Sequence, residues 1–146
     1  MDFIISEIIP FVKNHPMLSI GWVGLFVVII YLTVKSKLSK VKVINNAQAI
    51  AMMNKSEAAI VDLRSADNYR KGHITDSINI LPVDVKNGSV KSIEKYKDSG
   101  VILVDDNGLS AVANGDILVK QGFAKVFALK DGIAGWNGEN LPLVRK

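Results

Sequence analysis

The stretch VDLRSADNYRKGHITDSINI, residues 61–80, decides the fold class of this chain of 146 residues. It begins inside an apolar run, 58–63, that has an acid near its end, as expected for a buried parallel strand. A polar, helix-compatible segment follows at 66–71, and 78–81 is the next apolar run. Short apolar runs that alternate with such segments are typical of βα units. The stretch therefore predicts an α/β domain.

The same alternation continues on both sides of this stretch. We expect further strands at 41–44, 101–104 and 126–129, and helices from Asn45 or Asn46 through Met53, at 89–97, and from Ser110 through Gln121. Asparagine and serine are favoured at helix starts, and Gly122 is placed to end the last helix. Residues 43–146 are long enough to bury an adequate core, so we expect one globular domain there.

Two segments stand where chemistry is expected in such a domain. Ligands of open α/β sheets bind beyond the carboxyl ends of the strands. Asp62 and Arg64 end the strand at 58–63, and residues 105–110 follow the strand at 101–104. These are the candidate site segments.

Several motifs resemble the signatures of rhodanese-like domains. Residues 61–80 contain an Asp and an Arg at a strand end, an aromatic residue, a Gly-His-Ile motif and an Asn flanked by isoleucines. The segments VILVDDNG (101–108), QGF (121–123), LKDGIAGW (129–136) and LPL (141–143) follow in the order and spacing of that family. The resemblance implies a three-layer α/β domain with a mainly parallel five-stranded sheet.

The resemblance also exposes a departure at the catalytic position. It implies that the family's enzymes carry sulfur on a cysteine that opens a six-residue loop, held there by loop N–H groups and a helix N-terminus. In this chain the loop is Asp105, Asp106, Asn107, Gly108, Leu109 and Ser110. The chain contains no cysteine, and the loop contains no Lys or Arg to receive an anionic donor. Since a carboxylate forms no persulfide, sulfur transfer is predicted to be absent.

Four roles are open for Asp105. We expect its carboxylate to fill the anion-binding cradle by accepting the loop N–H bonds, because a helix N-terminus favours negative charge. The alternatives are a nucleophile acting on a small anionic substrate, a metal site with Asp106 and Asn107, and a sensor of small anions or sulfur compounds. The adjacent carboxylates of Asp105 and Asp106 repel an anionic ligand. A hard cation needs several oxygen ligands, which three adjacent residues rarely supply alone. We therefore expect no catalytic residue, no metal and no cofactor.

Three further residues are expected to support the loop. Asp62 and Arg64 are predicted to compensate each other's charge at the neighbouring strand end. His73, in the Gly-His-Ile motif, is interpreted as a hydrogen-bonded structural residue rather than an acid or base.

The N-terminal part of the chain has a different character. Residues 17–34 contain no charge, and at about 1.5 Å per residue 18 residues cross roughly 27 Å, close to a hydrocarbon core. A cleaved signal peptide is disfavoured because the leading region is net acidic and the run ends in Lys-Ser-Lys. A buried core helix is disfavoured because no polar face repeats at helical spacing. We predict one transmembrane helix at 17–34, and with it the chain is similar to bacterial membrane-anchored rhodanese-like proteins.

The lysines on either side of the predicted transmembrane helix determine its predicted orientation in the membrane. Lys35, Lys37, Lys40 and Lys42 follow the span, whereas Lys13 precedes it. The positive-inside rule then places the C-terminal domain in the cytoplasm and the N-terminus outside a bacterial inner membrane. We read 35–42 as a basic juxtamembrane linker in contact with anionic lipid headgroups. Residues 1–16 form a short extracytoplasmic segment, interrupted by Pro10, that lies at the outer interface or contacts a partner.

Charge excludes one class of partner. Residues 43–146 carry 13 basic and 12 acidic side chains, so no basic face for nucleic acid is indicated. The sequence therefore predicts a single-pass membrane protein whose catalytically inactive domain is a binding or regulatory module. Its expected partners are membrane proteins or membrane-associated cytoplasmic proteins.

Overall fold

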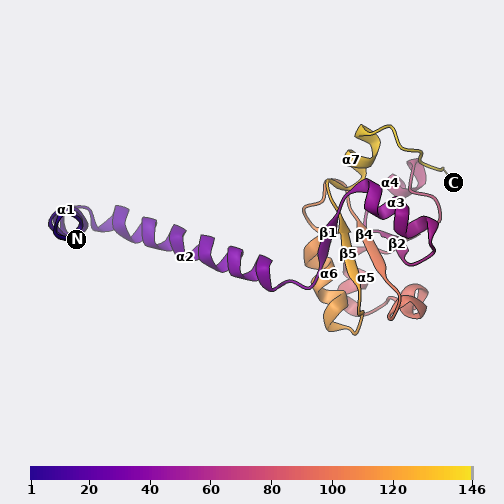
Figure 1. The fold of residues 1–146 in the computed structure, drawn as a ribbon, viewed down its shortest axis with the longest axis horizontal. Coiled ribbons are helices and arrows are strands. Elements are labelled where there is room, and N and C mark those ends of the chain that lie inside the picture. The colour runs from indigo at the N-terminus through magenta and orange to yellow at the C-terminus, as the bar shows by residue number, and fades with distance from the viewer. Residues whose placement is uncertain (146) are drawn as a thin grey trace. The chain divides into compact units, whose positions relative to one another are not determined.

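The computed structural model describes residues 1–145, which form two compact units. The first unit, Met1–Leu38, contains the helices α1 (Asp2–Asn14) and α2 (Pro16–Leu38), separated by His15. The second unit begins at Ser39 and contains the sheet (Figure 1). The interruption expected at Pro10 is wrong, because α1 runs through this proline. An internal proline removes one backbone hydrogen bond, and the helix continues on both sides of it.

The helix α2 is 23 residues long and apolar around its whole circumference, so it is long and apolar enough to cross a membrane. This confirms the predicted helix but moves its end. The helix continues to Leu38, so Lys35 and Lys37 belong to its last turn instead of to a linker. Lysine is a good helix former, and its charged end reaches away from the helix axis. Residues 39–41 alone connect α2 to the first strand.

The second unit is built on a five-stranded sheet with the order β1-β5-β4-β2-β3. All the paired strands run parallel, and one isolated antiparallel bridge joins His73 to Val144. The strands are β1 (Lys42–Ile44), β2 (Ala59–Asp62), β3 (Ile78–Asn79), β4 (Val101–Val104) and β5 (Val126–Leu129). The predicted mainly parallel five-stranded sheet is therefore confirmed.

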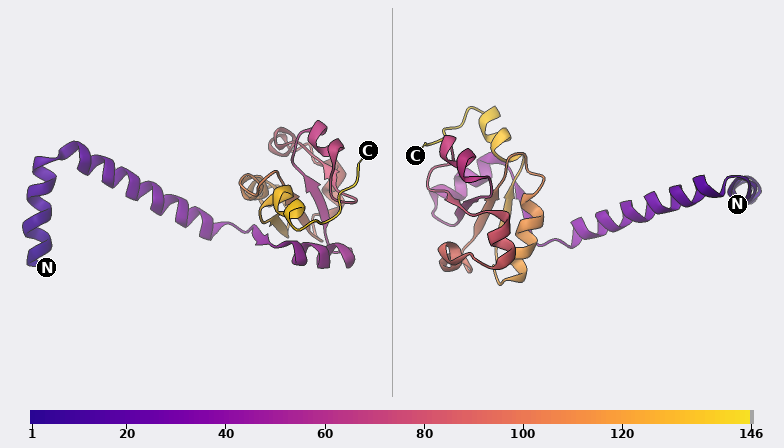
Figure 2. Two further views of the ribbon diagram at one scale, coloured as in Figure 1. Left: turned by 90° about the horizontal axis from the view of Figure 1, so that it is seen from above. Right: turned by 180° about the vertical axis from the view of Figure 1, so that it is seen from behind.

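Helices cover both faces of the sheet, which makes three layers (Figure 2). The register places Ile60 beside Ile102 on one face and Val61 beside Leu103 on the other. The first face packs against α3 (Asn46–Asn54) and α7 (Gly132–Gly138), and the second against α5 (Pro82–Asn87), the 3-10 helix η1 (Lys91–Tyr96) and α6 (Ala111–Lys120). Both faces of each central strand are thus buried, as the unbroken apolar runs predicted.

Several local details differ from the expectations. The helix expected at 89–97 is the shorter 3-10 helix η1, whereas α4 (Ala66–Lys71) has its predicted bounds. The short helices α5 and α7 were not predicted. The sequence of α7, GIAGWNG, has poor helix propensity, and the helix is held by its buried residues Ile133 and Trp136.

Candidate functional site

The loop 105–110 connects β4 to α6 at the carboxyl edge of the sheet. Asp105 follows the last residue of β4 directly, so the sheet fixes its backbone. Its side chain is buried, with the residue 4% exposed. A buried carboxylate requires hydrogen-bond partners, and the loop supplies them.

Four hydrogen bonds reach the Asp105 carboxylate. The Gly108 N–H donates to Oδ1 at 2.6 Å. The Ser110 N–H donates to Oδ2 at 2.8 Å, the Ser110 hydroxyl at 2.9 Å and the Ala111 N–H at 3.2 Å. Ser110 was expected to cap α6 with its own side chain, but its hydroxyl binds Asp105 instead. The carboxylate of Asp105 therefore satisfies the first N–H groups of α6, which are otherwise unpaired at a helix start.

Two glycines allow the loop to close around this carboxylate. Gly108 has φ +87°, and a Cβ there would lie 2.8 Å from the Asp131 nitrogen. Gly132, at the start of α7, has φ +55°, and its Cβ would lie 2.9 Å from Oδ1 of Asp105. Positive φ and such close approach both favour glycine. The N–H of Ile133 also donates to the Asp105 carbonyl at 2.9 Å, so α7 packs directly against the loop.

The other side chains of the loop point away from this cradle. Asp106 and Asn107 are exposed, and Leu109 is 83% exposed. The Asn107 side chain accepts the Leu109 N–H at 3.1 Å, which orders the loop tip. The loop thus presents one large apolar side chain and one free carboxylate on a rigid turn.

This geometry limits the chemistry of Asp105. A carboxylate has about four lone-pair positions; three donors reach Oδ2 of Asp105 and one reaches Oδ1. To attack a substrate, the Asp105 carboxylate would have to give up hydrogen bonds with the loop, and a metal would have to displace the same donors. Among residues 1–145 no group of three metal-ligating side chains is present.

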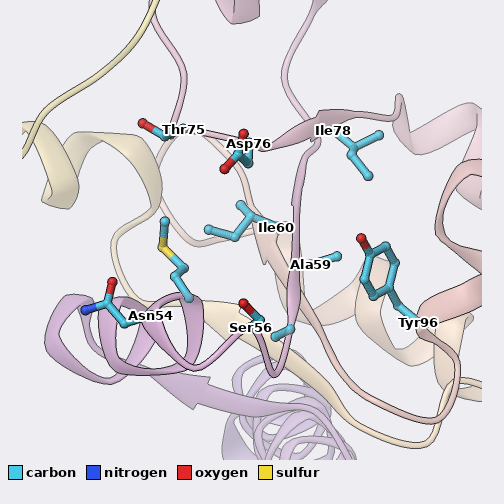
Figure 3. A pocket seen from close by; sticks show the side chains of 10 residues that line it. Asn54, Ser56, Ala59, Ile60, Thr75, Asp76, Ile78 and Tyr96 are labelled. Carbon is cyan, nitrogen blue, oxygen red and sulfur yellow. The ribbon is translucent and has the colours of Figure 1, made fainter.

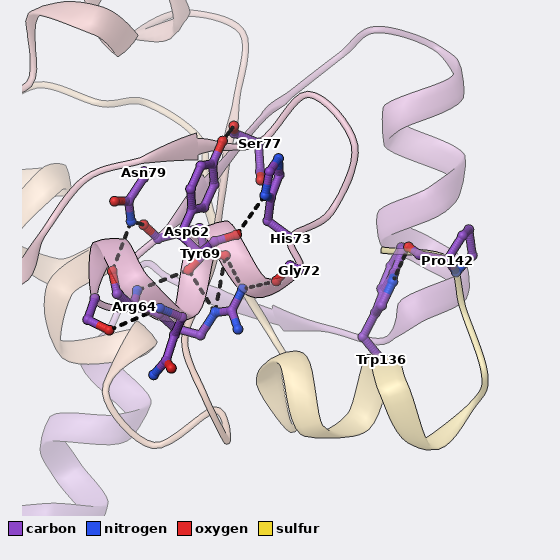
Figure 4. A network of polar contacts seen from close by, with 11 residues as sticks. Asp62, Arg64, Tyr69, Gly72, His73, Ser77, Asn79, Trp136 and Pro142 are labelled. Atoms are coloured by element: carbon purple, nitrogen blue, oxygen red, sulfur yellow. Dashed lines mark hydrogen bonds and ion pairs between the residues drawn. The ribbon is translucent and has the colours of Figure 1, made fainter. Parts of the chain in front are cut away.

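Asp62 and Arg64 form the ion pair expected from the sequence. The Arg64 Nη2 lies 2.8 Å from Asp62 Oδ2, and its Nε lies 3.1 Å from Oδ1. Both side chains are buried, and the Arg64 guanidinium also donates to the Gly72 carbonyl at 2.6 Å (Figure 4). The amide of Asn79 donates to the Asp62 and Arg64 carbonyls. The Arg64 side chain thus ties the end of β2 to the segment after α4, and the Asn79 amide ties it to β3.

His73 is a buried, hydrogen-bonded residue. Its Nδ1 donates to the Tyr69 carbonyl at 2.7 Å, and its ring stacks on Tyr69 with centroids 3.9 Å apart. Its backbone pairs with Val144. The sequence predicted that Asp62, Arg64 and His73 support the loop 105–110. Asp62 lies beside Val104 in the sheet, one residue before Asp105, but the hydrogen bonds described for these side chains lead to other segments.

The four lysines do not form one segment. Lys35 and Lys37 stand on α2, whereas Lys40 and Lys42 belong to the unit that begins at Ser39, and all four are exposed. They remain available to solvent or lipid headgroups.

The structure also contains a pocket that no sequence motif indicated. It has a volume of about 460 Å³ and is lined by the first residues of β2 (Figure 3). Ala59 pairs with Val101 at the start of β4, whereas Asp105 follows the other end of that strand. Asp76 is the charged residue in its lining, with Ser56, Thr75 and Tyr96 as hydroxyl groups. These residues come from segments far apart in the chain, so only the fold brings them together.

Comparison with known proteins agrees with the signatures read from the sequence. The family model of the rhodanese-like domain matches residues 45–139. The chain belongs to the rhodanese-like family. It is 51% identical to the uncharacterized protein YibN of Escherichia coli (strain K12), over 96% of this chain and 98% of that protein. The match spans nearly the whole chain, so it includes most of the N-terminal helical unit as well as the rhodanese-like domain.

Sulfurtransferases are more distant relatives. The thiosulfate sulfurtransferase GlpE of Pseudoalteromonas translucida is 30% identical over 65% of this chain and 88% of its own length. A rhodanese-related protein from Thermoplasma volcanium has a similar fold, with a TM-score of 0.61 at 22% identity, covering 72% of this chain and 99% of that structure. This chain has the fold of these proteins but lacks a cysteine, the residue that carries sulfur in the family's enzymes.

Proposed function

We propose that this protein is a membrane-anchored, catalytically inactive rhodanese-like domain that binds a protein partner at the cytoplasmic face of the bacterial inner membrane. One observation carries the proposal: the Asp105 carboxylate accepts four hydrogen bonds within the loop, which the resemblance identifies with the loop that holds a sulfur anion in the family's enzymes. The loop is complete without a ligand, and its exposed tip is free for recognition.

The tip has the character of a protein-binding surface. Leu109 is the most exposed large apolar side chain from β1 to Arg145. It stands on a loop held by the Asp105 carboxylate, so little conformational freedom is lost when a partner covers it. An apolar residue beside the free carboxylate of Asp106 fits a partner that presents an apolar pocket with a basic rim.

The N-terminal helix supports the proposed location. An exposed 23-residue helix of this apolar composition is long enough to cross the hydrocarbon core of a bilayer. Lys35, Lys37, Lys40 and Lys42 favour the cytoplasmic side for the domain and attract anionic headgroups, each by about 1 kcal/mol. Membrane proteins and membrane-associated cytoplasmic proteins are therefore the proposed partners.

A photo-crosslinking residue tests the recognition surface. We place it at Leu109 and, as a control, at the exposed Val43 of β1, each in the full chain in native membranes. The proposal predicts a discrete crosslinked protein from Leu109 that changing Asp106 to Lys abolishes. Equal products from both positions, or none from Leu109, would contradict it.

The rival function is an enzyme that uses Asp105 on a small anionic substrate. Wild type, Asp105→Asn and Asp105→Ala are compared with thiosulfate and with phosphate donors. We expect background turnover in all three. Turnover in wild type that both substitutions abolish would establish the rival. Calorimetry of the wild type with thiosulfate and phosphate tests the sensor alternative, and we expect no heat of binding.

A further inference from the structure

The helix α1 has an apolar side that nothing in the described chain covers. A helix turns about 100° per residue, which places Ile4, Ile5, Ile8, Ile9, Phe11 and Val12 on one side. Their exposed fractions run from 46% to 56%. Asp2, Ser6 and Lys13 lie on the opposite side, and Phe3 joins them in the first turn. α1 is therefore amphipathic, whereas α2 is apolar all round.

The length and charge of α1 exclude a second membrane crossing. Thirteen residues at about 1.5 Å each reach roughly 20 Å, well short of a core of about 30 Å. Asp2, Glu7 and Lys13 would also have to enter that core. A short helix with one apolar side is instead suited to the boundary between headgroups and acyl chains.

The join between the helices brings α1 to that boundary. The backbone of His15 leaves the helical conformation, with φ −132° and ψ 63°, and Pro16 begins α2. Figure 2 shows α1 turned away from the line of α2. A single residue allows little separation, so wherever α2 enters a bilayer, the end of α1 lies at its surface.

We propose that α1 is an interfacial helix that lies in the surface of the leaflet at the N-terminal end of α2. Its isoleucines, Phe11 and Val12 are buried among the acyl chains, and Ser6 and Lys13 face water. With one basic and two acidic side chains, α1 binds through apolar contact and needs no anionic lipid. This inference rests on the proposed membrane anchoring, because α2 must bring α1 to the bilayer.

Site-directed spin labelling tests the inference, since the chain has no cysteine to remove. Single cysteines at 3–9 and 11–13 are labelled in the full chain, reconstituted in pure phosphatidylcholine vesicles. Accessibility to oxygen and to a water-soluble nickel chelate is compared at each label. We expect the oxygen-to-nickel ratio to oscillate with the helical period and to be severalfold higher at Ile8 than at Ser6.

Three other patterns would overturn the inference. Nickel access at all positions means that α1 lies in water, and oxygen access at all positions means that it is inserted. Ile8 and Val12 closed to both reagents means that protein covers this side. A label at Val28 in α2 separates the two proposals. High oxygen access at Val28 with no oscillation in α1 rejects the interfacial helix alone, whereas nickel access at Val28 rejects the membrane anchor and the interfacial helix with it.

Discussion

Two hydrogen bonds join Ser110 to Asp105, because both the N–H and the hydroxyl of Ser110 donate to the same Oδ2 atom, at 2.8 and 2.9 Å. Oδ2 thereby lies at the start of α6, where the first N–H groups of the helix are unpaired. The negative charge of the carboxylate also interacts favourably with this end of the helix. Asp105, the residue at the position that the resemblance assigns to the sulfur-carrying cysteine, thus stabilises the loop around it.

Removing the Asp105 carboxylate should destabilise the domain. Asp105→Ala leaves three backbone N–H groups without their acceptor, and we expect a loss of about 2–4 kcal/mol in the free energy of unfolding. Asp105→Asn should cost less, because one oxygen is retained. Denaturant titration followed by Trp136 fluorescence measures this in a Trp22→Phe background. Asp106→Ala, at an exposed position, is the control and should change stability by less than about 0.5 kcal/mol.

The contact between α7 and the loop predicts different effects for two glycines of the same helix. Gly132→Ala forces a side chain into a positive-φ position beside Oδ1 of Asp105 and should cost at least about 2 kcal/mol. Gly138→Ala meets no atom within 4 Å and should be neutral or stabilising by up to about 1 kcal/mol. Equal effects in the same titration would show that the close packing at Gly132 is absent.

The buried ion pair predicts strong coupling between Asp62 and Arg64. Arg64→Ala leaves the Asp62 charge buried without its partner and should cost about 3–5 kcal/mol. The double variant Asp62→Asn, Arg64→Met should cost clearly less than the sum of its two single changes. A double-mutant cycle measures the difference. Additive effects would contradict the pairing.

The proposed orientation of the chain across the membrane can be measured with single cysteines, because the chain has no native cysteine that would also react. Ser6→Cys in α1 should react with a membrane-impermeant maleimide added to cells with a permeabilised outer membrane. Ser92→Cys in η1 should react only after the inner membrane is broken. The reverse pattern, or reaction of both before lysis, would reject the proposed topology.

The sequence predicted the features that follow from local patterns. The runs at 101–104 and 126–129 became strands because unbroken apolar stretches of that length suit a buried parallel sheet. The carboxylate of Asp105 was expected to accept the loop N–H bonds, because backbone donors and a helix N-terminus meet there.

The features that the sequence did not predict depend on tertiary packing. The glycine-rich α7 forms because Ile133 and Trp136 are buried against the sheet, which propensity alone does not reveal. The pocket beside Asp76 is lined by three separate stretches of the chain, at 53–60, 75–78 and Tyr96. A serine at a helix start commonly accepts an N–H of the first turn with its hydroxyl oxygen, whereas the position of Asp105 makes the Ser110 hydroxyl a donor.

The central claim is that the loop keeps the anion-holding geometry of its family and that Asp105 occupies it. The most direct test is the thiol pKa of the full-length Asp105→Cys variant, from thiolate ultraviolet absorbance relative to wild type. Leu109→Cys is the matched control on the same loop, expected near the ordinary value of about 8.5. We predict a thiol pKa at least about one unit lower for Asp105→Cys, because the donors of the cradle would hold the thiolate. A pKa equal to the control or above it, in a folded protein, would contradict the account.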